Sequence, residues 1–141
     1  MANIRPFRPQ DEAQVTRLWQ EIFPDDPPHN APHLVIQQKR LWHPELFFVL
    51  EVETELVGTA MAGYDGHRGW LNSIAVKPSH RRCGFGEQLV RHAEIALQRI
   101  GCPKVNLQIR DTNTEVAAFY SKLGYRVENL ISMGKLLSPG E

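Results

Sequence analysis

The chain has 141 residues, 42% hydrophobic and 23% charged, so we expect one globular domain over residues 1–141 rather than a disordered chain or a coiled coil. Sixteen Lys and Arg residues balance sixteen Asp and Glu residues, which excludes the overall basic charge that draws proteins to nucleic acid or anionic membranes. Cys83 and Cys102 form no Cys-x-x-Cys pair and no signal or membrane-spanning stretch is apparent, so we expect a cytoplasmic protein without disulfides or a metal site.

The first part of the chain predicts a strand and two helices. Ile4–Phe7 fits a short strand, and Asp11 is placed to cap a helix that ends at the turn-rich stretch Pro24–Pro28. A second helix is expected over Leu34–Leu41, before Pro44. The apolar residues of the first helix recur at helical spacing and are Val15, Leu18, Trp19 and Ile22.

Three strands are expected next. Leu46–Val52 is apolar on both faces, which is the pattern of a strand covered on both sides. Leu56–Tyr64 is expected to pair with it as a hairpin. The turn Asp65–Gly69 then leads into a strand over Trp70–Val76, which Pro78 terminates.

The last part of the chain begins with the best-marked helix, which Gly101 stops. Alternation from Val105 to Ile109 predicts a half-buried strand, and Asn113 can cap a short helix. One or two strands fit between Tyr125 and Leu137. The long helix carries an apolar stripe of Leu89, Val90, Ala93, Ala96, Leu97 and Ile100. This order predicts an α/β (α+β layered) fold with helices against a mostly antiparallel sheet.

The loop before the long helix has the composition of a phosphate site. Gly84 and Gly86 allow a close approach of the backbone, and the first turn of a helix offers unpaired N–H groups to an anion. Arg81 and Arg82 add local positive charge. The segment therefore predicts a pyrophosphate cradle, with a plain strand-to-helix turn as the alternative. It lacks both the P-loop pattern and the third glycine of a dinucleotide-binding turn.

Two motifs resemble those of the GNAT N-acetyltransferases. Ile74–Gly86, which reads IAVKPSHRRCGFG, is similar to the family motif Arg/Gln-x-x-Gly-x-Gly/Ala after a strand. Asn113–Tyr125, which reads NTEVAAFYSKLGY, is similar to its Asn…Tyr-x-x-x-Gly-Phe/Tyr segment. Gly63–Gly69 and Gly101–Lys104 further resemble the YpeA-like group of small bacterial members. The resemblance implies the GNAT fold, with a mixed, mostly antiparallel sheet of six to seven strands flanked by about four helices.

The same resemblance implies acetyl-CoA as a co-substrate and no metal. Strand backbone groups would meet the pantetheine arm and the thioester, and loop amides would hold the pyrophosphate. Tyr120 would lie near the sulfur and act as the catalytic residue, donating a proton to the leaving thiolate. The residues implied for cofactor binding are Ile74, Ala75, Val76, Arg81, Arg82, Cys83, Gly84, Phe85, Gly86, Asn113 and Tyr120.

The general base is left open. Gln108 stands where some relatives carry a Glu, and an amide cannot act as a base. Asp65, His67, Asp111 or a water molecule are the candidates. Cys83 has no partner placed by sequence to activate it, so we expect direct transfer in a ternary complex rather than an acyl-enzyme.

The acceptor is expected to be a small-molecule or peptide amine, bound by the first two helices, the turn Asp65–Arg68 and the final strands. A homodimer is left open. A rival hypothesis is a non-catalytic acyl-CoA-binding sensor or scaffold, which Gln108 favours. A drug or polyamine acetyltransferase is a second rival, and the acidic pair Asp25 and Asp26 is compatible with it.

Overall fold

The computed structural model describes residues 1–137. They fall into two compact units, Met1–Leu107 and Gln108–Glu141, the second described up to residue 137. Within the described part, no helix combines the length and the hydrophobicity needed to cross a bilayer.

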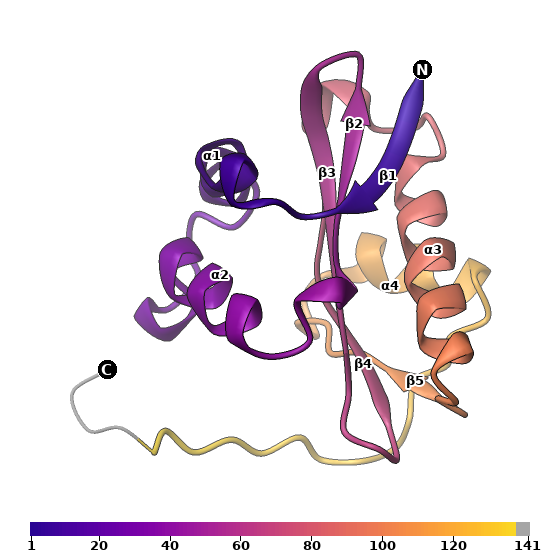
Figure 1. Cartoon of the computed structure of the whole chain (residues 1–141). Helices are drawn as coiled ribbons and strands as arrows, with labels where there is room; N and C mark the ends of the chain where they lie inside the picture. The colour runs from indigo at the N-terminus through magenta and orange to yellow at the C-terminus, as the bar shows by residue number, and fades with distance from the viewer. Residues whose placement is uncertain (138–141) are drawn as a thin grey trace. The chain divides into compact units, whose positions relative to one another are not determined.

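The first unit is built on a five-stranded sheet with the order β1-β2-β3-β4-β5 (Figure 1). Neighbours are antiparallel from β1 to β4, and β5 pairs with β4 in parallel. The mixed, mostly antiparallel sheet is thus confirmed, although the described residues form five strands rather than six to seven. The strands are β1 Ala2–Pro6, β2 Phe47–Val52, β3 Glu55–Tyr64, β4 Gly69–Val76 and β5 Val105–Asn106.

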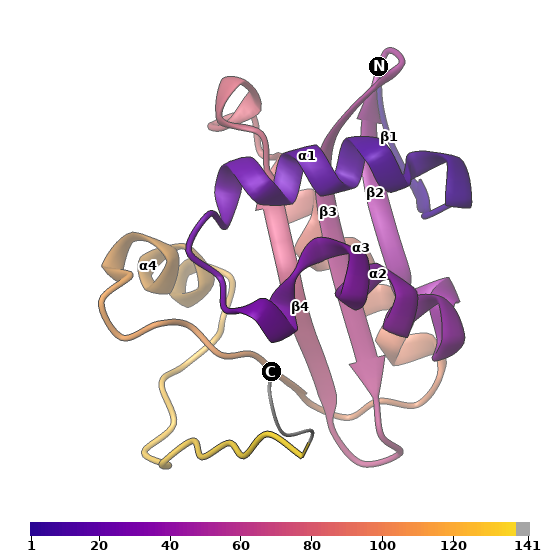
Figure 2. The same cartoon turned by 90° about the vertical axis from the view of Figure 1, so that its left-hand side faces the viewer.

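Helices cover both faces of this sheet. The helices α1 (Glu12–Ile22) and α2 (Pro32–Leu41) lie on one face, and α3 (Phe85–Arg99) lies on the other (Figure 2). Gly58 on β3 allows the close approach of α3, because a Cβ atom there would lie 2.9 Å from Cδ1 of the fully buried Leu89. The sheet therefore has apolar cover on both sides, which explains why Phe47, Phe48, Val49 and Leu50 of β2 are all buried, as predicted.

The apolar stripes predicted for the helices form the core. On α1, the side chains of Val15, Leu18 and Trp19 are buried in a cluster with Phe47 and Val49 of β2. On α3, the buried side chains are Leu89, Val90, Ala93 and Leu97. Ile100 departs from the prediction: it follows the last residue of α3 and is half exposed.

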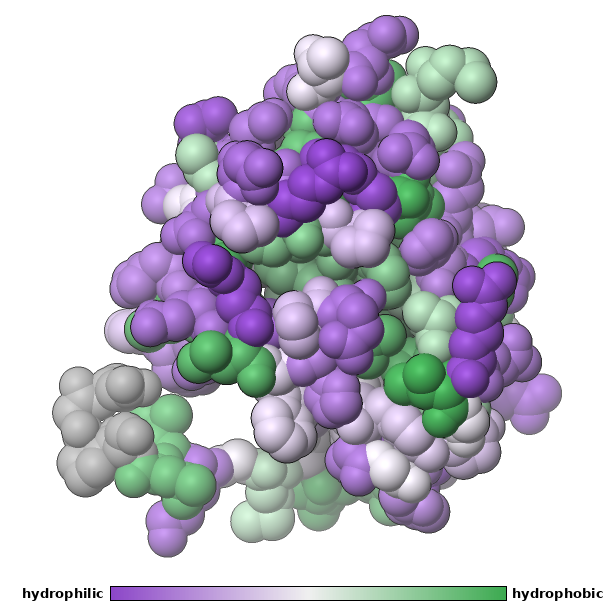
Figure 3. Space-filling view, viewed as in Figure 1, coloured by the Kyte–Doolittle hydropathy of each residue, from purple (hydrophilic) through white to green (hydrophobic). Residues whose placement is uncertain are grey.

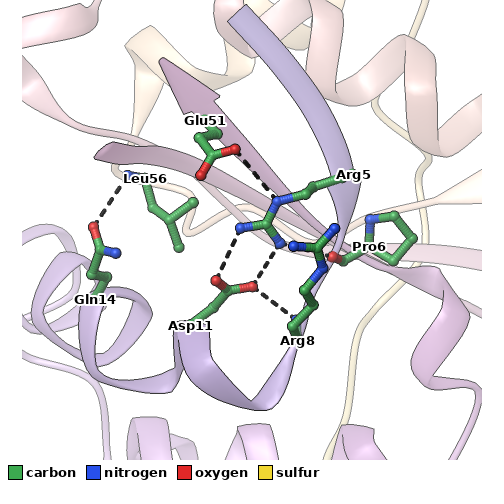
Figure 4. A network of polar contacts seen from close by, with 7 residues as sticks. All are labelled: Arg5, Pro6, Arg8, Asp11, Gln14, Glu51 and Leu56. Atoms are coloured by element: carbon green, nitrogen blue, oxygen red, sulfur yellow. Dashed lines mark hydrogen bonds and ion pairs between the residues drawn. The ribbon is translucent and has the colours of Figure 1, made fainter. Parts of the chain in front are cut away.

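Asp11 precedes α1 as predicted, but its carboxylate does not cap that helix. Asp11 has a right-handed helical backbone and closes a 3₁₀ turn, so the side chain reaches back along the chain. It accepts a hydrogen bond from the Arg8 N–H at 2.8 Å and two from the Arg5 guanidinium at 2.8 and 3.0 Å (Figure 4). Arg5 also pairs with Glu51 of β2 at 3.6 Å. This network joins β1, β2 and the start of α1.

Acid should selectively weaken this network. Burial alone raises the pKa of Asp11, but the hydrogen bonds from Arg5 and Arg8 outweigh it and hold that pKa below its usual 3.8. A depressed folded-state pKa gives stability that is present above pH 4 and lost as the pH falls through that pKa. We expect Asp11→Asn to lower the free energy of unfolding by about 2 kcal/mol at pH 7, and the difference from the wild type to shrink below pH 4.

Urea unfolding from pH 7 down to pH 3 measures this. Glu53→Gln is the matched control, because among residues 1–137 the Glu53 carboxylate pairs with the exposed N-terminal amine alone and should contribute little. A destabilisation by Asp11→Asn that stays constant with pH would contradict the ionic account.

The second unit contains the helix α4 (Thr114–Lys122), with the Asn113 side chain accepting a hydrogen bond from the Val116 N–H at 3.3 Å, as predicted. The strands predicted between Tyr125 and Leu137 are wrong: none of these described residues is in a helix or strand. Their apolar side chains are exposed, and green hydrophobic atoms mark the end of the described segment in Figure 3. The apolar residues of this segment are compatible with a strand, but a strand also needs a neighbouring strand with which to form hydrogen bonds.

The strand predicted from Val105 to Ile109 is also shorter than expected. β5 covers only Val105–Asn106, and its pairing with β4 stops at Trp70. β4 itself continues to Val76, but no described residue after Asn106 pairs with it, so the alternating sequence alone does not extend β5.

Candidate active site

An irregularity in β4 is the first component of the site. The register between β3 and β4 shifts between Thr59 and Met61, where two residues of β4, Ser73 and Ile74, face a single residue of β3. Ser73 has a φ of 52°, in the left-handed region that non-glycine residues rarely adopt. This is a β-bulge, which interrupts the backbone pairing and re-aims the groups beside it.

The outer edge of β4 is open next to this bulge. β5 pairs only with Gly69 and Trp70 of β4, and no other strand of the described residues pairs with the edge from Leu71 to Val76. Ile74, Ala75 and Val76 therefore lie on an edge where an extended ligand can bind to backbone groups. These are the three strand residues for which the resemblance of the motifs implies cofactor binding.

The loop after β4 forms the second component. It leads through a 3₁₀ turn, Pro78–His80, to α3, and both Arg82 and Gly84 have left-handed backbones, with φ of 64° and 79°. The Arg81 Nε donates a hydrogen bond to the carbonyl of Val76 at 3.2 Å, which ties the loop to the end of β4.

The start of α3 fits an anionic group. Gly84 is the N-cap of α3, so no side chain competes for the N–H groups of the first turn, and a Cβ atom at this position would meet nothing within 4 Å. The helix dipole and the nearby Arg81 and Arg82 side chains favour an anion here, while Glu87 is the one acidic residue of the first turn. These are the features of an anion site, and the diphosphate expected here from the sequence stays a prediction.

Cys83 lies inside this loop and is exposed. Its Sγ is 3.6 Å from the Arg81 carbonyl oxygen, to which the thiol donates. No histidine or carboxylate is recorded against it among the described residues, so the geometry shows nothing that would activate it as a nucleophile.

A pocket of about 320 Å³ lies beside the bulge. It is bounded by the end of α1, the proline-rich connection to α2, the start of α2 and Ser73. Trp19, Phe23 and Val35 provide apolar walls, and Asp26 provides a carboxylate. The two helices that the sequence assigned to the acceptor side therefore do line a pocket. The turn Asp65–Arg68 does not contribute to it.

The structure does not place the candidate general bases Asp65 and Asp111 beside the bulge at Ser73. The Asp65 carboxylate accepts hydrogen bonds from the N–H groups of Arg68 at 2.7 Å and His67 at 2.8 Å, and these bonds lower its pKa. The turn that holds Asp65 lies at the far end of the β3–β4 hairpin from the bulge. Gly69, the first residue of β4 after this turn, is already four residues, or about 13 Å, from Ser73 along the strand. A lowered pKa and this separation both argue against Asp65 as the base. Asp111 is exposed and belongs to the second unit.

Asn113 and Tyr120 also belong to the second unit. The Tyr120 ring is buried and packs edge-on against the rings of Phe119 and Tyr125, with centroids 5.0 and 5.5 Å apart. Burial raises the pKa of the Tyr120 phenol well above its usual value of 10. The hydroxyl therefore stays protonated near neutral pH, which suits a proton donor and not a base.

Sequence reasoning missed the importance of Ser73. A strand is expected over Trp70–Val76, and nothing in its hydrophobicity signals a left-handed residue. The one available signal was the polar pair Asn72-Ser73, which breaks the apolar pattern of the strand.

Comparison of the sequence with known proteins identifies one family. The chain matches the model of the acetyltransferase (GNAT) family over residues 13–125. It is 40% identical over 134 residues to an acetyltransferase of Yersinia pseudotuberculosis and to one of Pectobacterium atrosepticum, in each case covering 95% of this chain and 94% of the relative.

Two solved structures show the same fold. Ard1 of Thermoplasma volcanium matches with a TM-score of 0.81 and 27% identity, covering 90% of this chain and 84% of that one. The aminoglycoside N-acetyltransferase AAC(6')-Iy in complex with CoA matches with a TM-score of 0.78 and 19% identity, covering 98% and 96%.

Proposed function

Because this chain belongs to the GNAT acetyltransferase family, we propose that its 141 residues form one cytoplasmic N-acetyltransferase domain that moves an acetyl group from acetyl-CoA to a primary amine. One observation carries the proposal. The open, bulged edge of β4 runs directly into a cationic loop with two left-handed residues at the start of α3. A pantetheine arm and a diphosphate need these two surfaces in this order.

Each part of the chain has a role in this proposal. Backbone groups of Ile74, Ala75 and Val76 bind the pantetheine arm along the open edge. The N–H groups from Arg82 to Gly86 bind the diphosphate, supported by the Arg81 side chain. Asn113 contacts the cofactor from the second unit, as the family resemblance implies.

The chemistry is a direct transfer. The amine nitrogen forms a bond to the acetyl carbonyl carbon, and the bond from that carbon to sulfur breaks. The amine loses one proton to a base or to water, and Tyr120 supplies one proton to the thiolate, so that an amide and a free thiol result. Cys83 carries no acyl group, since its thiol bonds to the Arg81 carbonyl and no activating partner accompanies it.

The pocket beside Ser73 is the proposed acceptor site. Its volume of about 320 Å³ is at the small end of ligand pockets, and its walls are mostly apolar. A compact amine or the first residue of a peptide fits these dimensions. Solved structures with this fold include an aminoglycoside N-acetyltransferase and the ribosomal-protein-S18-alanine N-acetyltransferase of Escherichia coli.

Calorimetric titration with acetyl-CoA, followed by a free-thiol release assay, tests the function. The amines to compare are spermidine, an aminoglycoside and a short peptide with an N-terminal alanine. We expect acetyl-CoA to bind and at least one amine to accelerate thiol release. Absence of cofactor binding would contradict the proposal.

A non-catalytic acyl-CoA sensor is the second candidate. It is favoured by Gln108, an amide where some relatives have a carboxylate, whose Nε2 donates to the Ser132 hydroxyl. Binding of acetyl-CoA without thiol release on any amine, and without slow hydrolysis, would favour this candidate over the enzyme.

A further inference from the structure

A buried threonine connects the bulge to the helical layer. Thr59 on β3 is fully buried, and its hydroxyl oxygen accepts a hydrogen bond from the Trp19 Nε1 of α1 at 2.9 Å. The same hydroxyl donates to the carbonyl oxygen of Ser73 at 2.8 Å. Thr59 thus lies between a buried indole and the left-handed residue of β4.

The direction of these two bonds is fixed by chemistry. The indole N–H can only donate, so it must use an acceptor site on the Thr59 oxygen. The single hydroxyl hydrogen of Thr59 is then directed at the one acceptor recorded for it, the Ser73 carbonyl. Trp19 is itself 3% exposed and its N–H needs a partner inside the protein.

The bond to Ser73 also orients the next backbone N–H. The carbonyl of Ser73 and the N–H of Ile74 belong to one planar trans peptide, so they point in opposite directions. When the carbonyl is held against Thr59, the Ile74 N–H is turned away from β3. Ile74 is one of the two bulge residues that face a single residue of β3, and the strand edge on its other side is open.

We propose that Thr59 is a positioning residue for acetyl transfer: it holds the Ser73–Ile74 peptide so that the Ile74 N–H faces the thioester carbonyl. This inference rests on the proposed function. The Ile74 N–H then stabilises the negative charge that develops on the carbonyl oxygen. Trp19 and Ser73 both line the pocket. The hydrogen bonds from Trp19 to Thr59 and from Thr59 to Ser73 therefore also connect the proposed acceptor pocket to the Ser73–Ile74 peptide.

Thr59→Val tests the proposal, since valine has nearly the same shape and lacks the hydroxyl. CoA lacks the thioester carbonyl that the Ile74 N–H faces in this proposal, so the Kd of acetyl-CoA should rise about 5-fold while the Kd of CoA stays unchanged. Turnover should fall about 10- to 100-fold with any amine that the wild-type protein acetylates. Thr59→Ser keeps the hydroxyl and should restore both quantities.

A second measurement does not depend on the variant folding. In the ¹⁵N-labelled wild-type protein, the Ile74 amide proton should shift downfield more with acetyl-CoA than with CoA. Equal shifts, or an unchanged ratio of the two Kd values in folded Thr59→Val, would overturn the role of Thr59 and leave acetyl-CoA binding intact. Failure of the wild-type protein to bind either compound would instead overturn the proposed function, and this inference with it.

Discussion

Gly84→Asp is expected to weaken acetyl-CoA binding about 30-fold or more while α3 stays folded, which corresponds to about 2 kcal/mol. An Asp side chain at this N-cap accepts hydrogen bonds from the same first-turn N–H groups that the diphosphate would use, and its charge repels the phosphates. The fold should tolerate the change, because a Cβ atom at Gly84 meets nothing within 4 Å. The left-handed backbone costs about 1 kcal/mol, least for Asp and Asn.

Gly84→Asn is the matched control. It has the same size and the same backbone strain, but no charge, so its loss of affinity should be about 5-fold. The gap between the Asp and Asn variants should narrow at high salt because exposed charges are screened. Calorimetry with acetyl-CoA measures all three proteins. Wild-type affinity in a folded Gly84→Asp would show that the diphosphate binds elsewhere.

The sequence predicted well the elements whose own periodicity determines them. The α3 stripe and the doubly covered β2 were confirmed because each follows from local apolar spacing and burial. The left-handed backbone at Gly84 accounts for a glycine at this helix start, while its role in binding a diphosphate stays a prediction. Both motifs that carried the family resemblance lie within the matched residues, 13–125.

The errors arose where tertiary contacts decide the outcome. Asp11 stands at the position expected of a helix cap, but the Arg5 guanidinium is a stronger partner for its carboxylate. The residues after Tyr125 have strand-like composition, yet they are not paired as strands.

The bulge at Ser73 is hydrogen-bonded to a side chain of the neighbouring strand. No local pattern encodes the hydrogen bond that Thr59 donates across the sheet, 14 residues away in sequence. The general base is undetermined for a related reason, because its choice depends on which groups meet at the pocket and not on any short motif.

Tyr120→Phe is expected to lower turnover at saturating acetyl-CoA by about 10-fold, the low end of the range for general acid–base catalysis. We expect a fall at the low end because the raised pKa of the Tyr120 phenol makes it a weak proton donor. A CoA thiolate has a pKa of about 8.5, so a phenol with a pKa above 10 gives up its proton only as charge develops on sulfur. Proton transfer from this phenol to sulfur is therefore uphill, which keeps the expected gain in rate small.

Tyr125→Phe is the control for this prediction, because it removes a hydroxyl from the ring that packs edge-on against Tyr120 and should leave turnover unchanged. Cofactor affinity should change little in either variant, since both keep the aromatic ring and the loop at Gly84 is untouched. The pH dependence of turnover between pH 7 and pH 10 should also have the same shape in the wild type and in Tyr120→Phe. A phenol with a raised pKa stays protonated across that range, so its ionisation adds no loss of rate to the wild-type profile. Full turnover in Tyr120→Phe would leave the ring with a packing role only, and the thiolate would then take its proton from water.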